Sequence, residues 1–494
     1  MSSTSELARF AAHLRESMLL SKWGATTALN SPTGAGEADF EALALQLFAL
    51  QFKHNVPYRR LCEARGARPD TVARWTDIPA APTSAFKEFD LSCLPAEERT
   101  TVFHSSGTTG QKPSRHYHNA ASLALYEASA LRWFAAHFQL PIANCQSGEA
   151  KAAPAGKLGI GNWRLAILTP PPAQAPHSSL VHMFETIRRE CGSGGSTACA
   201  SDGRDQQAIG SPSPPLEERG RERRHITTLN AAVRSELPAG CRTNSSGTLN
   251  ENDGLLSLPL SSKGGEGNSA GAFEHRESSK KQSEDSPFVG TANEDGAWTL
   301  DTDAALKRLK EVCLSGKLLL MLGTAFSLVH LLDYLAKQDL RFELSPGSCA
   351  LETGGYKGRS RSLSKAALHA LISERLGIPP AHIVCEYGMS ELSSQAYDSA
   401  NSPSRFTFHA SPSTLHAPRS FRFPPWARVQ IISPETGCEV AEGETGLIRV
   451  FDLANVYSVM AIQTEDLGIR RGNGFALAGR AVLAEPRGCS LLAV

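Results

Sequence analysis

Apolar residues recur every three or four positions in several parts of this chain. The stretch 40–66 has this spacing and ends on Gly66, which predicts one long helix with a glycine terminus. The stretches 121–138, 303–313 and 364–377 repeat the pattern and predict three more amphipathic helices. Helices of this kind bury one face against another layer of the protein.

Two short apolar runs, 163–170 and 318–323, have the length and the flanking residues of buried strands. Pro170 closes the first run and Gly323 closes the second. Because strands alternate with helices along the chain, the pattern predicts an α/β fold built in layers. We find no short internal repeat in the sequence.

The middle of the chain has a different composition. From Cys191 to Asp295, Gly, Ser, Asn, Glu, Arg and Lys dominate and aromatic residues are nearly absent. Such a segment buries too little apolar surface to offset its ordering entropy, so we expect it to be disordered. The 494 residues therefore divide into a first part at 1–190, an insertion at 191–295 and a second part at 296–494.

Two peptides suggest how the insertion arose. PSPPLEERGRE (Pro212 to Glu222) and LSLPLSSKGGEG (Leu256 to Gly267) can be encoded by opposite strands of one DNA element. We interpret the insertion as an inverted repeat translated in frame, without a catalytic role. Chance similarity between low-complexity codons is the alternative, and the nucleotide sequence decides between the two.

Charge and cysteine content narrow the range of functions. Lys and Arg together number 50, as do Asp and Glu, so the charge suggests neither a nucleic acid nor a membrane surface as partner. The longest apolar run, 318–332, is short for a membrane span, and the N-terminus lacks the apolar core of a signal peptide. The 11 cysteines are scattered, which predicts reduced thiols in a cytoplasmic protein.

One stretch, FHSSGTTGQKPSRHYH (Phe103 to His118), gathers small hydroxylated residues and glycines. Backbone N–H groups can crowd around an anion where no side chain intervenes, and hydroxyls add donors, so the stretch predicts a phosphate-binding loop. Lys112 and Arg115 follow as charge partners, but the Lys-Pro sequence excludes a Walker loop. A polar connecting turn is the alternative. His116 and His118 have no partner visible in the sequence, and we interpret them as structural.

Five stretches, in order along the chain, resemble motifs of the adenylate-forming enzymes, which include acyl-CoA synthetases, luciferases and peptide-synthetase adenylation domains. SSGTTGQKP resembles their phosphate loop, and LETGGYKG (Leu351 to Gly358) their adenine-contacting segment. YGMSE (Tyr387 to Glu391) resembles their Tyr-Gly-x-Thr-Glu motif. TEDLG (Thr464 to Gly468) and LAGR (Leu477 to Arg480) resemble their ribose-binding motifs. The resemblance implies an α/β fold, that of the large N-terminal domain of these enzymes.

A narrower resemblance is to the LuxE-type acyl-protein synthetases. It is carried by FALQFKHNVPYRRLC, DIPAAPTSAFKEFDL, SSLVHMF, ETGGYKGRSRSLS and AEPRGCSL, and covers roughly 38–190 and 297–494. Members of this family activate a fatty acid with ATP and pass the acyl group as a thioester towards a reductase. The resemblance implies ATP and Mg²⁺ as cofactors, a fatty acid as substrate and an acyl-CoA reductase-like protein as partner.

The resemblance assigns roles to residues near the phosphates and the adenine. The ATP phosphates would be held by the loop residues Ser105, Ser106, Gly107, Thr108, Thr109 and Gly110. Lys112 would neutralise charge, with a solvated lysine as the alternative. Gly354 and Gly355 would allow close backbone approach to adenine or to the acyl-adenylate, with a plain turn as the alternative.

The later motifs supply the remaining roles. Tyr387, followed by Gly388, would stack on adenine, with core packing as the alternative. Glu391 would hold Mg²⁺, because a hard cation prefers carboxylate oxygen. Asp466 would accept hydrogen bonds from both ribose hydroxyls, and Arg480 would reach the ribose or the adenylate.

The chain departs from the superfamily at its C-terminus. Members usually add a small domain after the Gly-Arg motif, with a lysine that assists adenylation. Here only fourteen residues follow Arg480, so we expect this domain to be missing or vestigial. Lys112, Lys357 and Arg487 are candidates to replace that lysine.

Cys489 is the candidate acyl acceptor, because a neighbouring Arg487 lowers the pKa of a thiol. The LuxE-type family is acylated on a cysteine near its C-terminus, and this position matches. An ordinary buried cysteine is the alternative.

Three functions stay open at this point: an acyl-protein synthetase, an acyl- or aryl-CoA ligase, and an inactive nucleotide-binding relic.

Overall fold

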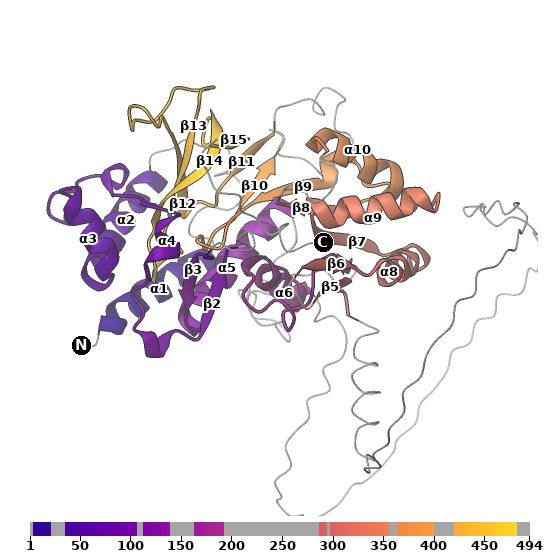
Figure 1. The fold of residues 1–494 in the computed structure, drawn as a ribbon, viewed down its shortest axis with the longest axis horizontal. Coiled ribbons are helices and arrows are strands. Elements are labelled where there is room, and N and C mark those ends of the chain that lie inside the picture. The colour runs from indigo at the N-terminus through magenta and orange to yellow at the C-terminus, as the bar shows by residue number, and fades with distance from the viewer. Residues whose placement is uncertain are drawn as a thin grey trace, which may run out of the picture. The chain divides into compact units, whose positions relative to one another are not determined.

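The chain folds as a mixed α/β protein with one large mixed sheet (Figure 1). The computed structural model describes residues 3–20, 35–105, 112–138, 163–191, 286–293, 297–354, 363–399 and 419–481. All of these belong to one unit, made of 1–197 and 282–494. A second unit, 198–281, lies outside the described residues, as does nearly all of the predicted insertion.

Four neighbouring strands of the large sheet run parallel. They are β4 (Trp163–Ile167), β7 (Leu318–Thr324), β8 (Cys349–Thr353) and β9 (Ile383–Tyr387). Parallel strands are covered on both faces and therefore read as continuous apolar runs. Both predicted strands are confirmed, as β4 and β7; β7 is almost wholly buried, whereas Arg164 of β4, at the edge of the sheet, is exposed.

Helices cover both faces of this parallel part. Alternate residues of β7 point to opposite sides, so Leu320 and Leu322 join one apolar core while Leu319 and Met321 join another. The first core includes α5 (Ala120–Phe138) and α6 (Ser179–Cys191). The second core is built with α8 (Thr302–Ser315), α9 (Ala325–Lys337) and α10 (Lys365–Leu376).

The sheet continues beyond β9 with antiparallel strands. In spatial order from β9 these are β10 (Ala396–Ser399), β11 (Ser420–Arg422), β15 (Gly474–Arg480), β14 (Ala461–Arg471), β13 (Thr445–Asp452) and β12 (Ala427–Ile432). The two-residue strand β1 (Ala81–Pro82) pairs with β14. The change from parallel to antiparallel pairing falls between β9 and β10, at the segment that carries Tyr387 and Glu391.

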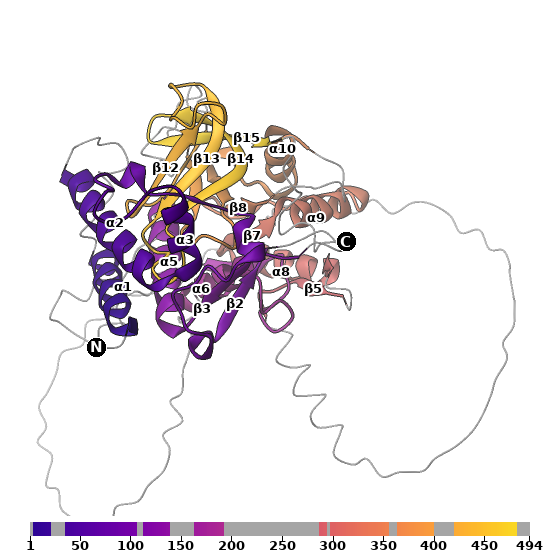
Figure 2. The same ribbon diagram turned by 60° about the vertical axis from the view of Figure 1, so that its left-hand side comes forward.

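The N-terminal helix α2 (Ala35–His54) lies beside the antiparallel part, next to β12 (Figure 2), while α3 (Val56–Ala64) packs on α2 and α1 (Ser3–Leu19) packs mainly against α5. Arg428 of β12 pairs with Glu37 of α2 at 3.0 Å and lies over the Phe40 ring. Short elements complete the unit: α4 (Ala85–Glu88), β5 (Gly290–Ala292), β6 (Trp298–Leu300) and three 3₁₀ turns at 75–77, 96–98 and 380–382. Among the described residues, no helix is long and apolar enough to cross a bilayer.

One helix prediction needs correction. The predicted helix over 40–66 is two helices, because Asn55 breaks it and caps α3 by accepting from the Tyr58 N–H. Pro57, in the first turn of α3, lacks an N–H and suits a helix start. The helices predicted at 121–138, 303–313 and 364–377 are confirmed as α5, α8 and α10.

The phosphate loop is not followed directly by a helix. Strand β3 (Arg115–His118) comes first and pairs with β2 (Thr101–His104), so the loop connects the two strands of a hairpin. Helix α5 begins only after β3. The alternation of buried His116 and His118 with partly exposed neighbours is the two-residue period of a strand.

Candidate functional site

The structure describes the base of the predicted phosphate loop. Ser105 and Ser114 close it, since the Ser114 N–H donates to Ser105 Oγ at 2.9 Å and the Ser105 N–H donates to the Ser114 carbonyl at 3.3 Å. The predicted loop residues between them lie outside the described residues: Ser106, Gly107, Thr108, Thr109 and Gly110.

This loop base lies against the segment that carries Glu391. The hydroxyls of Ser114 and Ser390 are 3.4 Å apart, and His116 Nδ1 donates to the Ser390 carbonyl at 2.8 Å. Ser390 Oγ in turn donates to Glu391 Oε2 at 3.1 Å. The fold therefore brings together the predicted phosphate loop and the predicted metal-holding carboxylate, which are separated by more than 270 residues in sequence.

Glu391 is held from the other side by Asn455, which sequence reasoning missed. Glu391 is fully buried, and its carbonyl accepts from Asn455 Nδ2 at 2.8 Å. Asn455 Oδ1 accepts from the Ser393 hydroxyl at 2.6 Å, and Gln51 of α2 donates to the Asn455 carbonyl at 2.8 Å. No sequence signal marks Asn455, because it is a single amide in the connection between β13 and β14.

Two buried histidines border this part of the site. Burial lowers the pKa of His116 to about 4, so its imidazole is neutral at neutral pH and donates from Nδ1. Burial, with the neighbouring His116 and His182, also lowers the pKa of His118 well below its usual value. Neither imidazole is therefore charged at neutral pH, and His116 acts on the site through its hydrogen bond to Ser390.

On the opposite side of the same motif, Tyr387 meets the ribose-motif residues. Its hydroxyl donates to Asp466 Oδ2 at 3.0 Å. Asp466 lies opposite Arg480 in the β14–β15 pair, and its Oδ1 is 3.1 Å from Arg480 Nε. Arg480 also pairs with Glu465 at 2.9 Å. The structure thus brings Tyr387, Asp466 and Arg480 together, while their roles at the nucleotide stay predictions.

The ring of Tyr387 lies in an aromatic cluster with Phe421, Phe423 and Phe475, whose ring centres are 5.2–6.3 Å away. Burial, together with the Asp466 charge, raises the pKa of Tyr387 well above its usual value. Tyr387 is therefore a hydrogen-bond donor to Asp466 and a packed side chain. Its stacking on adenine stays a prediction.

Two predicted glycines occupy positions that restrict side chains. Gly354, at the end of β8, has a φ of 71°, which few other residues adopt. A Cβ on Gly388 would clash with Glu386 Oε1, so a side chain at that position would require the Glu386 side chain to move. Gly355 lies outside the described residues.

Glu386 itself is a buried acid that sequence reasoning overlooked. It accepts a hydrogen bond from the Thr353 hydroxyl, across the β8–β9 pair. Burial raises the pKa of Glu386 to about 7. Its place directly before Tyr387 is the signal that could have drawn attention to it.

Of the three candidate cations Lys112, Lys357 and Arg487, the structure describes only Lys112. The Lys112 side chain is half exposed and lies 3.6 Å from Glu88, so its role at the phosphates stays a prediction. Cys489, Lys357 and Arg487 lie outside the described residues.

The donor set around Glu391 fits the implied cofactors. A carboxylate oxygen and the hydroxyls of Ser114 and Ser390 are hard oxygen ligands of the kind that Mg²⁺ prefers. The loop base faces the same carboxylate, as binding of a nucleotide phosphate with its cation requires.

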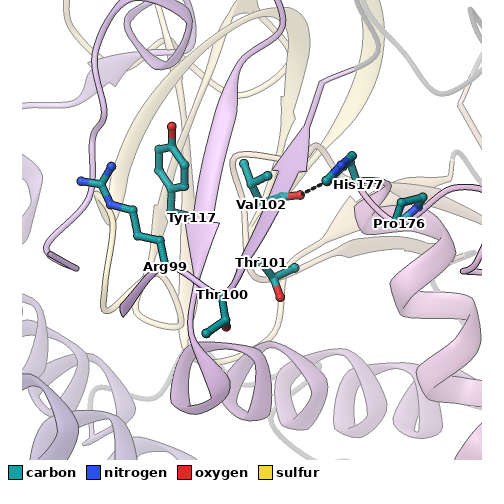
Figure 3. A pocket seen from close by; sticks show the side chains of 7 residues that line it. All are labelled: Arg99, Thr100, Thr101, Val102, Tyr117, Pro176 and His177. Carbon is teal, nitrogen blue, oxygen red and sulfur yellow. Dashed lines mark hydrogen bonds between the residues drawn. The ribbon is translucent and has the colours of Figure 1, made fainter. Parts of the chain in front are cut away.

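A separate pocket of about 280 Å³ lies on the β2–β3 hairpin (Figure 3). His177 Nδ1 donates to the Val102 carbonyl at 3.1 Å at its edge, and Arg99 lies over the Tyr117 ring on the other side. Tyr117 of the stretch 103–118 lines it, but no residue with a predicted nucleotide-binding role does, so we do not assign it to the nucleotide.

Comparison with curated proteins finds a relative for one part of the chain. Over 70 residues, 14% of this chain, it is 39% identical to a long-chain-fatty-acid–luciferin-component ligase of Photorhabdus luminescens. The match spans 60% of that relative's length. No family model matches the chain.

Solved structures that align with this chain include two that were determined with nucleotide ligands. A 2-hydroxyisobutyryl-CoA ligase bound to its acyl-adenylate aligns with a TM-score of 0.49 and 11% identity, covering 91% of this chain and 69% of that chain. The ATP-bound MatB of Rhodopseudomonas palustris aligns with a TM-score of 0.37 and 13% identity, covering 85% and 56%. At these identities, no residue's role follows from either structure.

Proposed function

We propose that this protein uses ATP to activate a long-chain fatty acid as an acyl-adenylate and then transfers the acyl group to a cysteine thiol. The observation that carries the proposal is the convergence on one segment, 387–391. Its Glu391 end contacts the phosphate-loop base, and its Tyr387 end contacts Asp466 and Arg480. A phosphate site and a ribose site joined by one segment suit a nucleotide.

In the first step, a fatty acid carboxylate oxygen attacks the α-phosphorus of ATP. An O–P bond forms, the bond to the β-phosphate bridge breaks, and pyrophosphate leaves. Backbone N–H groups and hydroxyls of the loop that starts at Ser105 stabilise the charge on the phosphates. Glu391 would hold Mg²⁺, which when bound offsets phosphate charge. Asp466 and Arg480 orient the ribose.

In the second step, a thiolate attacks the acyl carbon of the adenylate. A C–S bond forms, the C–O bond to the phosphate breaks, AMP leaves, and the thiol proton passes to solvent. We assign the thiol to Cys489, since Arg487 beside it favours the thiolate. An acyl-CoA reductase-like protein is the proposed recipient, and the matched relative is named for a long-chain fatty acid and a luciferin component rather than for coenzyme A.

The test supplies full-length protein with ATP, Mg²⁺ and radiolabelled long-chain fatty acid. We expect pyrophosphate release and label on the protein that hydroxylamine removes. Cys489→Ser should keep fatty-acid-dependent ATP–pyrophosphate exchange but lose the label, because the thiol acts after the ATP chemistry. Cys438→Ser, which changes an exposed cysteine, is the matched control and should label normally.

Each part of the proposal can fail separately. Absence of pyrophosphate release with any fatty acid would remove the adenylation step and leave a nucleotide-binding relic. Unlabelled protein that forms acyl-CoA when coenzyme A is added would make it a coenzyme A ligase. Normal labelling of Cys489→Ser would place the acyl group on another cysteine.

A further inference from the structure

A second cluster of reactive side chains lies behind the nucleotide segment. Glu352 of β8 and Cys385 of β9 are directly opposite each other in the parallel pair, and His369 of α10 reaches both. Their exposed fractions are 3%, 1% and 5%. Glu352 lies in the LETGGYKG motif but has no predicted role there, and His369 and Cys385 lie outside the predicted motifs, so the cluster needs its own explanation.

The three donor atoms are mutually close. Glu352 Oε2 is 2.9 Å from His369 Nε2 and 3.3 Å from Cys385 Sγ, and that sulfur is 3.6 Å from His369 Nε2. Zinc binds carboxylate oxygen and imidazole nitrogen at about 2.0–2.1 Å and thiolate at about 2.3 Å in a tetrahedron. The corresponding edges are about 3.3, 3.5 and 3.6 Å for O–N, O–S and S–N pairs. The observed separations match these edges to within about 0.4 Å.

We propose that Glu352, His369 and Cys385 form a binding site for a zinc-like divalent cation. Thiolate, imidazole and carboxylate are the ligand types of protein zinc sites. Three protein ligands leave the fourth position for water. On binding, the Cys385 S–H proton is released to solvent, and the His369 Nε2 lone pair faces the metal while the ring proton is on Nδ1.

The charges around the cluster are compatible with replacing the Cys385 proton by a metal ion. Asp398 is paired with Arg419 at 2.8 Å, so neither requires a further partner. The Lys365 ammonium makes a hydrogen bond with Cys385, but Lys365 is an exposed residue at the start of α10. Its flexible side chain can move towards solvent or donate to the thiolate. Replacing one proton by a divalent cation adds one positive charge, which deprotonation of a bound water offsets, since zinc lowers the pKa of that water to about 7.

This site differs in chemistry and consequence from the magnesium site at Glu391. A thiolate selects softer metals than Mg²⁺, which prefers oxygen ligands alone. The bound metal would join β8, β9 and α10 within two residues of Gly354 and Tyr387. It would therefore hold the two strand ends that carry the adenine-side residues.

The experiment uses the full-length protein produced with added zinc, dialysed and analysed for metal, and a second sample reconstituted with Co²⁺. We expect about one equivalent of zinc per chain. The cobalt form should show visible bands of a tetrahedral site and an ultraviolet thiolate-to-cobalt charge-transfer band. Cys385→Ser should lose the charge-transfer band and bind zinc at least about 10-fold more weakly. Cys349→Ser, which changes a buried cysteine of β8 outside the cluster, should behave as wild type.

Folded wild-type protein that retains neither metal would overturn the proposal and leave a buried hydrogen-bonded network. Equal zinc content in wild type and Cys385→Ser would overturn it as well. If Cys385→Ser does not fold, His369→Gln and the wild-type cobalt spectrum decide, because a cobalt form without the thiolate band contradicts the assigned ligands.

Discussion

The two ends of segment 387–391 are both buried, but the contacts that they make differ in exposure. At one end, Glu391 is fully buried, and Ser390 and Asn455 hold it by hydrogen bonds. At the other end, the side chains of Asp466 and Arg480 are 20% and 24% exposed. Removing a partner of a buried polar group costs far more than breaking an exposed ion pair. The comparison suggests that the phosphate side is preorganised, whereas the ribose side can adjust to its ligand.

The largest effect is expected at the buried end. Glu391→Gln keeps the size of the side chain but removes the charge that holds the metal. Loss of one preorganised electrostatic contact costs on the order of 100-fold in rate. We expect ATP–pyrophosphate exchange to fall by about that factor, with the half-maximal magnesium concentration shifted upward. Glu435→Gln, at an exposed turn, is the control. Unchanged exchange and magnesium dependence in Glu391→Gln would remove Glu391 from the site.

Burial of Glu386, which directly precedes this segment, predicts a pH dependence of stability. The pKa of Glu386 is raised by burial from 4.5 to about 7 in the folded protein, so the folded state retains a proton that the unfolded state releases. Stability should therefore fall as the pH rises from about 4.5 to 7 and level off above it, by roughly 3 kcal/mol at most. Glu386→Gln stays neutral and should gain stability relative to wild type over this range.

Urea unfolding at pH 5 and pH 8 measures this difference. Glu374→Gln, which changes a surface carboxylate paired with Arg341, is the matched control and should follow the wild-type pH profile. A Glu386→Gln profile parallel to wild type would show that Glu386 is not the group responsible.

A smaller effect is expected from His116, which acts through Ser390. His116→Ala removes the donor to the Ser390 carbonyl, and a hydrogen bond of this kind contributes about 0.5–1.5 kcal/mol, or up to about 10-fold. His116→Asn keeps an N–H donor near the Nδ1 position and should restore most of the exchange rate. The magnesium dependence should shift in His116→Ala alone. If both variants lose only thermal stability, with normal magnesium dependence, His116 has a purely structural role.

The smallest effect is expected at the exposed end. Arg480→Lys weakens the ion pairs with Asp466 and Glu465, and partly exposed pairs contribute about 0–1 kcal/mol. We expect the KM for ATP to rise by up to about fivefold while kcat stays close to wild type. A kcat lowered by 100-fold or more would contradict the inference that the ribose side serves mainly in binding, because it would mean that Arg480 acts on the transition state.

How well the sequence predicted the fold differs between the parallel and the antiparallel strands. The runs at 163–170 and 318–323 were predicted as strands because parallel strands buried on both faces are continuously apolar. The hairpin strand β3 escaped prediction because His116 and His118 are buried polar residues, and polar residues hide the two-residue period. The helix break at Asn55 was not predicted either, because the helical spacing of apolar residues continues across this N-cap.

What the sequence by itself determined was the set of motif residues and their order. Gly354, Gly388 and Glu391 could be named because small residues and single carboxylates stand out within ordered motifs. Only the tertiary structure decided which residues support them. Asn455, His116 and Glu386 act through contacts with residues distant in the chain or across a strand pair. Such contacts leave no local pattern, because their energy depends on burial and on partners that the fold alone brings within hydrogen-bonding distance.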